Sequence, residues 1–225
     1  MSQEASPLAV FFDLDGCLID SRRAFVSSVN AALQDNGQPP RPAEALIPRI
    51  GPPLPSTFEL LVAPDLVARC VVSYYEHAYA DAARLTDVFE GIPALLESLA
   101  ADLPLVVATS KPVELASALL EALDLRHRFV AVVGPPQSDP SETKIETMRR
   151  AISLVQYESA VMIGDTRFDI EGALMHALIP IGVSWGIGTE AQLREAGASL
   201  VVDSPAELEQ QIRRIQRSAA GQAIR

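Results

Sequence analysis

The chain has few cysteines, a deficit of positive charge and no long apolar run, and each shortage excludes a class of protein. Its 225 residues include two cysteines, too few for a disulfide framework or a cysteine-rich zinc site. Lysine and arginine number 18 against 29 aspartates and glutamates. The resulting net charge of −11 argues against binding to a nucleic acid polymer or to an anionic membrane.

No apolar run approaches the roughly 18 residues that cross a bilayer, so we expect no membrane-spanning segment. The first residues, MSQEASPLAV, lack the basic region and long apolar stretch of a signal peptide, which predicts a cytoplasmic protein. Hydrophobic residues make up 48% of the chain and charged residues 21%, as in ordinary globular proteins. The three histidines lie far apart in the sequence, and none is expected to be a catalytic base.

Short apolar runs rich in valine, isoleucine and phenylalanine are typical of buried strands. They occur at residues 8–12, 103–108, 129–133, 160–163, 179–183 and 200–202. Helical patterns at 113–123, 144–154, 190–196 and 206–217 lie between most of them. This alternation predicts an α/β fold, with a doubly wound, Rossmann-like parallel sheet at its core.

The interval from Asp13 to Leu103 interrupts the alternation. It shows no clear strand, and helices are expected at 22–36, 55–62 and 65–83, separated by proline-rich stretches that would end them. We therefore predict a helical cap at residues 19–86, inserted after the first strand of a core formed by 1–18 and 87–225. Because open α/β sheets bind ligands beyond the carboxyl ends of their strands, such a cap could cover the site.

Acidic side chains follow two of the predicted strands. Asp13 and Asp15 come directly after the first strand and before Gly16, and Asp165 and Asp169 follow the strand at 160–163. A strand-ending turn would explain the first pair, and a helix N-cap with a first-turn acid would explain the second. Converging carboxylates at one sheet edge instead predict a hard divalent cation, and Mg²⁺ suits a site completed by water and a substrate phosphate.

Hydroxyl and ammonium groups occupy the two remaining positions of interest. Thr109 and Ser110 end the strand at 103–108, where hydroxyls and free N–H groups before a helix can bind phosphate oxygens. A simple strand-to-helix cap would also explain them. Lys144 begins a predicted helix, where a cation opposes the helix dipole. That placement favours another role for Lys144, although an exposed surface lysine is the alternative.

These four segments, in this order, resemble the motifs of the haloacid dehalogenase superfamily of aspartate-nucleophile phosphohydrolases. Asp13-Leu14-Asp15-Gly16 resembles the first motif, Thr109 the second, Lys144 the third, and Gly164-Asp165 with Asp169 the fourth. The likeness covers essentially the whole chain, including a helical cap. The strings at 50–54, 108–112 and 181–188 are similar to the phosphoglycolate phosphatase-like and 5′-nucleotidase-like branch.

The resemblance implies a phosphomonoester hydrolase. Asp13 would attack phosphorus to form an aspartyl-phosphate, and Asp15 would protonate the leaving oxygen and then activate water. Mg²⁺ would be held by the Asp13 carboxylate, the Asp15 carbonyl and Asp165, with Asp169 orienting its surroundings. The phosphate would lie among Gly16, Thr109, Ser110 and Lys144.

The expected partner is a small phosphate ester such as phosphoglycolate, a nucleoside monophosphate or a sugar phosphate. Arg49 and Gly51 of the cap are candidates for the contacts that select it. We expect a monomer or a homodimer. A phosphomutase of the same fold and a non-catalytic phospho-ligand binding module are the alternative functions.

Overall fold

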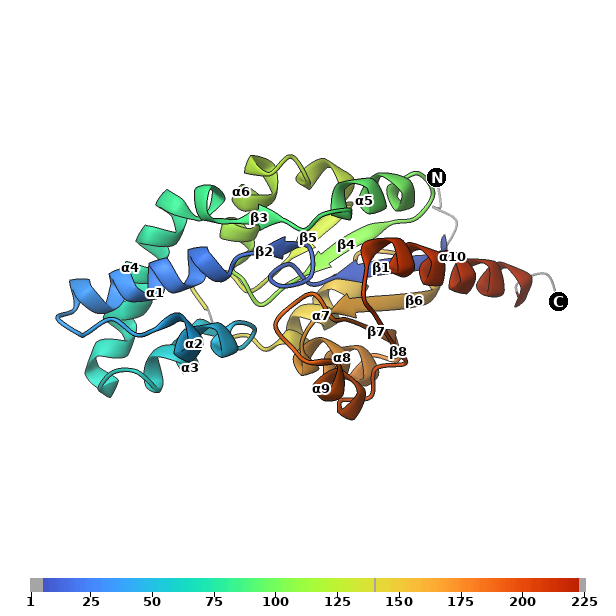
Figure 1. The fold of residues 1–225 in the computed structure, drawn as a ribbon. Coiled ribbons are helices and arrows are strands. Elements are labelled where there is room, and N and C mark those ends of the chain that lie inside the picture. Colours follow the sequence, from blue (N-terminus) through green and yellow to red (C-terminus); the bar gives the residue numbers. More distant parts are fainter. Residues whose placement is uncertain (1–5, 140, 223–225) are drawn as a thin grey trace.

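The computed structural model describes residues 6–139 and 141–222 and has a six-stranded sheet at its centre (Figure 1). All neighbouring strands of this sheet are parallel, and their order is β5-β4-β1-β6-β7-β8. The strands are β1 (Ser6–Phe12), β4 (Leu105–Ala108), β5 (Ala131–Val133), β6 (Tyr157–Gly164), β7 (Ile179–Val183) and β8 (Leu200–Val202). Each predicted strand is present, with ends that shift by up to three residues, and the doubly wound α/β class is confirmed.

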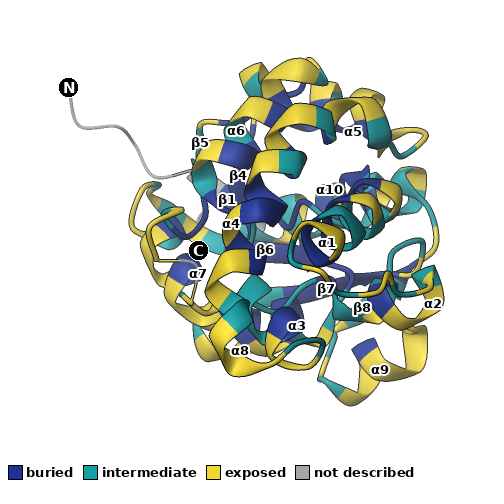
Figure 2. Cartoon of the chain, turned by 90° about the vertical axis from the view of Figure 1, so that its left-hand side faces the viewer, coloured by how far each residue is buried: buried dark blue, intermediate teal, exposed yellow. Residues whose placement is uncertain are grey.

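Helices cover both faces of the sheet because its strands alternate their side chains between two apolar layers. Leu8, Val10 and Phe12 of β1 face the layer that contains residues of α5 (Ile92–Ala100), α6 (Val113–Ala122) and α10 (Pro205–Gln222). Ala9 and Phe11 face the layer formed with α7 (Lys144–Ile152) and α8 (Arg167–Met175). The short helix α9 (Glu190–Glu195) lies near β7 and β8. Figure 2 shows the strands buried between helices whose outer faces are exposed.

A second group of helices lies to the left of the sheet in Figure 1. It comprises α1 (Arg22–Asp35), α2 (Ala43–Leu46), α3 (Leu54–Glu59) and α4 (Pro64–Asp81), with 3₁₀ turns at Ile47–Arg49 and Ala83–Leu85. A proline at the first or second position starts both α3 and α4, where its missing N–H costs nothing. These helices share an apolar cluster of their own, which includes Val29, Leu33, Phe58 and Tyr74 and is joined by Leu115 of α6. We propose residues 19–86 as the cap.

The chain passes between the sheet and this helical group through two short strands. β2 (Ile19–Asp20) and β3 (Asp87–Val88) pair antiparallel with each other, Ile19 opposite Val88. The expectation of no strand between Asp13 and Leu103 is therefore wrong at these positions. Strands of two residues are too short to show a periodic pattern in a sequence.

The order of the strands determines where loops can meet. Counted along the chain, the six strands are arranged 3-2-1-4-5-6, and ligands of such sheets bind where the order reverses beside the first strand. Phe12 at the end of β1 is paired with Val107 of β4 and with Ile163 of β6. The residues that follow these three strands therefore meet at one place. Within the described ranges, no helix combines the length and apolarity needed to cross a membrane.

Candidate active site

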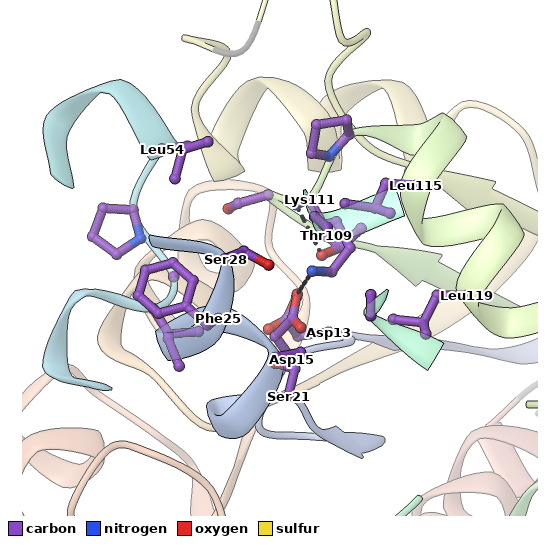
Figure 3. Close-up of a pocket in the computed structure, with 18 of the residues that line it drawn as sticks. Asp13, Asp15, Ser21, Phe25, Ser28, Leu54, Thr109, Lys111, Leu115 and Leu119 are labelled. Atoms are coloured by element: carbon purple, nitrogen blue, oxygen red, sulfur yellow. Dashed lines mark hydrogen bonds and ion pairs between the residues drawn. The ribbon is translucent and has the colours of Figure 1, made fainter. Parts of the chain in front are cut away.

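A pocket lies between the carboxyl ends of the central strands and the helices of the cap (Figure 3). Its empty volume is about 820 Å³, a figure that counts the open space at its mouth. The sheet side contributes the charged residues of the described lining and several hydroxyls, namely Asp13, Asp15, Thr109, Ser110, Lys111, Lys144, Thr166 and Asp169. The cap contributes residues from α1, α3 and α4 and from the loop that contains Gly51.

Three buried carboxylates meet beside this pocket. Asp13, Asp165 and Asp169 each place one oxygen within 4.8 Å of the others. Asp13 follows β1 and Asp165 follows β6, the strand paired with β1, so the register of the sheet brings them together. The Lys144 ammonium lies 2.6 Å from Asp13 Oδ1 and 2.7 Å from Asp169 Oδ1. Lys144 is thus a buried partner of the cluster, which excludes the exposed surface lysine.

Backbone and loop contacts hold the other two carboxylates in place. Asp165 Oδ2 accepts a hydrogen bond of 2.7 Å from the Ile187 N–H, whereas its Oδ1 is buried without a partner among the described protein atoms. Asp169 Oδ2 accepts from the N–H and the hydroxyl of Thr166 in a capping box at the start of α8. The helix-cap explanation of Asp169 therefore holds together with its contact to Lys144.

The negative charges of the cluster outnumber its positive charge, and its pKa values are shifted. Burial raises the pKa of Asp13 to about 7; Lys144 opposes that rise, and the neighbouring Asp169 and Asp15 add to it. Burial and the charges of Asp169 and Asp13 also raise the pKa of Asp165 well above its usual range. Burial alone would lower the pKa of Lys144, but the facing carboxylates hold it above the ordinary lysine value. A cation beside these carboxylates would favour their ionised forms.

The donor set fits a hard divalent cation. The Lys144 ammonium contacts two of the three carboxylates, those of Asp13 and Asp169. The unpartnered oxygen of Asp165 is an oxygen donor of the kind that Mg²⁺ prefers. Gly16 packs directly against this carboxylate. A Cβ atom at Gly16 would lie 2.1 Å from Asp165 Oδ2, so a side chain there would displace the acid.

Lys111 is a site residue to which the sequence motifs assigned no role. Its ammonium lies 3.3 Å from Asp15 Oδ2, and both side chains are largely buried. Its backbone N–H donates to Thr109 Oγ1 at 3.1 Å, so Thr109 stabilises the loop and is not the N-cap of α6, a position that Pro112 occupies. The signal in the sequence was a lysine two positions after Thr109, at the same strand end.

The remaining predicted residues divide into two groups. Ser110 and Gly51 line the pocket. Gly16, which was expected to bind phosphate, is not among the lining residues; it has a positive φ of 87° and packs against Asp165. Arg49 is not among the lining residues. The 3₁₀ turn at Ile47–Arg49 directs its Nε to the Ala45 carbonyl, 3.0 Å away, on the exposed side of the cap.

Comparison with known proteins identifies the family. The profile of the haloacid dehalogenase-like hydrolases matches residues 10–179, which include Asp13, Thr109, Lys144 and Asp165. The chain belongs to this family. The resemblance drawn from the four sequence motifs is confirmed, and the four motif segments of this haloacid dehalogenase-like chain line one end of its sheet.

Relatives of this haloacid dehalogenase-like protein carry different names. It is 31% identical to the tyrosine-protein kinase PtkA of Mycobacterium tuberculosis over 81% of its own length, but that match spans 64% of the relative. It is also 31% identical to a phosphoglycolate phosphatase of Chromobacterium violaceum, over 89% of this chain and 94% of that one. A solved structure of a predicted phosphatase from Clostridium acetobutylicum superposes with a TM-score of 0.85, at 33% identity, covering 94% of this chain and 100% of that one.

Proposed function

We propose that this protein is a Mg²⁺-dependent phosphomonoester hydrolase that acts through an aspartyl-phosphate on Asp13. The observation that carries the proposal is the pairing of two acids with two lysines in one pocket: Asp13 contacts Lys144, and Asp15 contacts Lys111. Such a pocket offers a nucleophile, a proton donor and cations for a phosphoryl group. Relatives named as phosphatases support the same conclusion.

In the first step, a carboxylate oxygen of Asp13 forms a bond to phosphorus and the bond from phosphorus to the leaving oxygen breaks. Asp15, two residues further on and lining the same pocket, gives that oxygen its proton. In the second step, the Asp15 carboxylate takes a proton from water, whose oxygen bonds to phosphorus. The bond to Asp13 then breaks, which restores its carboxylate and releases inorganic phosphate.

Residues around Asp13 would hold the transferring group. Thr109 Oγ1 accepts from the Lys111 N–H, which leaves its own hydroxyl hydrogen to donate to a phosphoryl oxygen. The ammonium groups of Lys144 and Lys111 lie at the same end of the pocket and would offset its negative charge. Ser110 lines the pocket beside them.

Mg²⁺ would be held by carboxylates of Asp13 and Asp165 and by the Asp15 carbonyl, with Asp169 fixing Lys144 at their side. When bound, the ion would screen the charge between the phosphoryl group and Asp13. The chain's own part is to keep Asp165 oriented: its Oδ2 is fixed by the Ile187 N–H, so its Oδ1 is the oxygen left for the ion.

The test is release of inorganic phosphate from a panel of small phosphomonoesters, with Mg²⁺ or with excess EDTA. We expect release with Mg²⁺ only, and none from Asp13→Asn, with its circular dichroism spectrum and melting temperature measured to check that it is folded. Asp81→Asn is the matched control, because Asp81 pairs with Arg84 on the outside of the cap and does not line the pocket.

Two results would contradict the proposal. Full activity in Asp13→Asn would exclude Asp13 as nucleophile. Transfer of the phosphoryl group to an acceptor, with little inorganic phosphate released, would favour a phosphomutase or a kinase instead.

A further inference from the structure

The wall that the cap presents to the pocket is uncharged. Among the described residues of the stretch 21–86 that line the pocket, none carries an ionisable acid or base that is charged at neutral pH. Aliphatic and aromatic side chains such as Phe25, Leu54 and Tyr74 make up most of it. Burial raises the pKa of the Tyr74 and Tyr75 hydroxyls, so both phenols stay neutral. A charged group held against this wall would lose its hydration without gaining a partner.

The cations that line the pocket are already paired at its other end. Lys144 contacts Asp13 and Asp169. Lys111 contacts Asp15, an ion pair drawn as a dashed line in Figure 3. These are the lysines on the described lining, and no arginine accompanies them. Arg49 is directed to a backbone carbonyl outside the pocket. A substrate with a second anionic group would therefore find no cation at the cap end.

Aromatic side chains gather at the cap end of the pocket. Phe25 and Tyr74 pack edge to face with ring centroids 6.0 Å apart, and Tyr74 and Tyr75 do the same at 5.5 Å. Figure 3 shows Phe25 and Leu54 on one side of Asp13 and Asp15, and Leu115 and Leu119 of α6 on the other. A flat apolar group placed between these two sides would contact rings and branched side chains alike.

One polar atom in this uncharged region lacks a partner. Thr86 lines the pocket just before β3, is 5% exposed, and its Oγ1 is buried with no hydrogen bond to any described protein atom. A buried hydroxyl without a partner costs free energy, which a hydrogen bond to a bound molecule would recover. A ligand with a hydroxyl or amide near Thr86 would supply this missing hydrogen bond.

We infer that the substrate is a phosphate monoester whose leaving group is uncharged and ring-shaped, with its apolar face against Phe25 and Tyr74 and one hydroxyl or amide facing Thr86. This inference rests on the proposed hydrolase function and narrows its substrate class. It excludes small esters that carry a second anionic group, such as phosphoglycolate, as preferred substrates, because their carboxylate would face the uncharged wall.

The experiment compares matched substrates by kcat/KM for phosphate release with Mg²⁺. Benzyl phosphate and 4-carboxybenzyl phosphate have almost the same reacting centre and differ by a remote carboxylate. We expect benzyl phosphate to be preferred by about 10- to 100-fold, because the carboxylate is desolvated without a counter-ion. The kcat/KM for phosphoglycolate should also be lower than that for benzyl phosphate. 4-(Hydroxymethyl)benzyl phosphate adds an uncharged hydroxyl to the ring, and so tests whether the leaving group forms a hydrogen bond with Thr86.

Two variants move the specificity in defined directions. Leu54→Lys places a cation on the uncharged wall. It should reduce the ratio of kcat/KM for benzyl phosphate to kcat/KM for 4-carboxybenzyl phosphate by about 10-fold. Leu60→Lys adds the same charge six residues further on, where Leu60 is 69% exposed and outside the pocket, and should leave the preference unchanged. Thr86→Val should lower kcat/KM about 3- to 10-fold for the hydroxymethyl substrate but not for benzyl phosphate.

The outcomes separate this inference from the function on which it rests. If phosphoglycolate or 4-carboxybenzyl phosphate is turned over as well as benzyl phosphate, the uncharged-substrate inference is wrong and the hydrolase function stands. If Thr86→Val affects both benzyl substrates equally, Thr86 does not recognise the leaving group. If no ester on the panel releases phosphate with Mg²⁺ while the protein is folded, the hydrolase function fails and the inference fails with it.

Discussion

Gly16 gives the sharpest test of how the carboxylate cluster is built. A Cβ atom there would lie 2.1 Å from Asp165 Oδ2, whereas real Cβ contacts essentially never fall below 3.0 Å. Asp165 or the loop of Gly16 must therefore retreat by about 0.9 Å in Gly16→Ala. Gly37 is the matched control: it also has a positive φ, 70° against 87° for Gly16, but a Cβ atom there would meet nothing within 4 Å.

Both alanine variants should lose stability, but only Gly16→Ala should also lose activity. Each forces an alanine into the left-handed region at about 1–2 kcal/mol. For a chain of this size that lowers the melting temperature by about 2–8 °C. Only Gly16→Ala also displaces Asp165, and a shift near 1 Å in a catalytic constellation costs about 100-fold in rate.

The assay pairs thermal unfolding, followed by circular dichroism, with kcat/KM for phosphate release in the presence of Mg²⁺. We expect both variants to melt below the wild type and only Gly16→Ala to lose about two orders of magnitude in kcat/KM. Wild-type kcat/KM in Gly16→Ala would refute the argument that Asp165 must stay in place. An equal loss of activity in Gly37→Ala would show that the left-handed strain, and not the contact with Asp165, is responsible.

Two further predictions concern charged groups, one in the carboxylate cluster and one far from it. Lys144→Met leaves Asp13 and Asp169 without their buried cation, so the free energy of unfolding in urea should fall by about 3–5 kcal/mol; unchanged stability would show that the pair contributes nothing. Asp102 is partly buried, which opposes ionisation, but hydrogen bonds from Gln216 and Arg213 outweigh this and lower its pKa. Its contribution is therefore present above the unfolded-state value of about 3.9 and is lost as the pH falls through the lower folded-state pKa. We expect the melting temperature of Asp102→Asn to lie slightly below that of the wild type at pH 7 and to converge with it in acid. A gap between the two melting temperatures that persists at low pH would contradict this.

The sequence was sufficient to predict which strand ends lie together beside the pocket. Apolar runs mark β1, β4 and β6 plainly, and the parallel arrangement requires their carboxyl ends to lie at one edge. The positions of Asp13, Thr109 and Asp165 follow from that rule alone. Lys144 could be placed only by resemblance, because it belongs to a helix and reaches the cluster from outside the sheet.

The contacts that orient these residues were beyond sequence reasoning. The Ile187 N–H that holds Asp165 is a backbone group in a loop 22 residues away, and no side-chain pattern marks it. The ion pair between Lys111 and Asp15 depends on how two loops approach each other. Arg49 shows the opposite error: it is two residues from Gly51, which lines the pocket, yet a 3₁₀ turn directs it away.

The antiparallel pair of β2 and β3 has a consequence for how such a protein can change over evolution. The chain leaves the sheet and returns to it through two strands that are paired with each other. The intervening helices therefore form an insertion whose two ends lie side by side. An insertion with adjacent ends can be lengthened, shortened or exchanged while the rest of the chain keeps its path. The acids and lysines that line the pocket all lie outside that insertion, and the uncharged wall lies within it. A lineage could therefore acquire a new substrate by replacing one continuous stretch of gene, and keep the reaction unaltered.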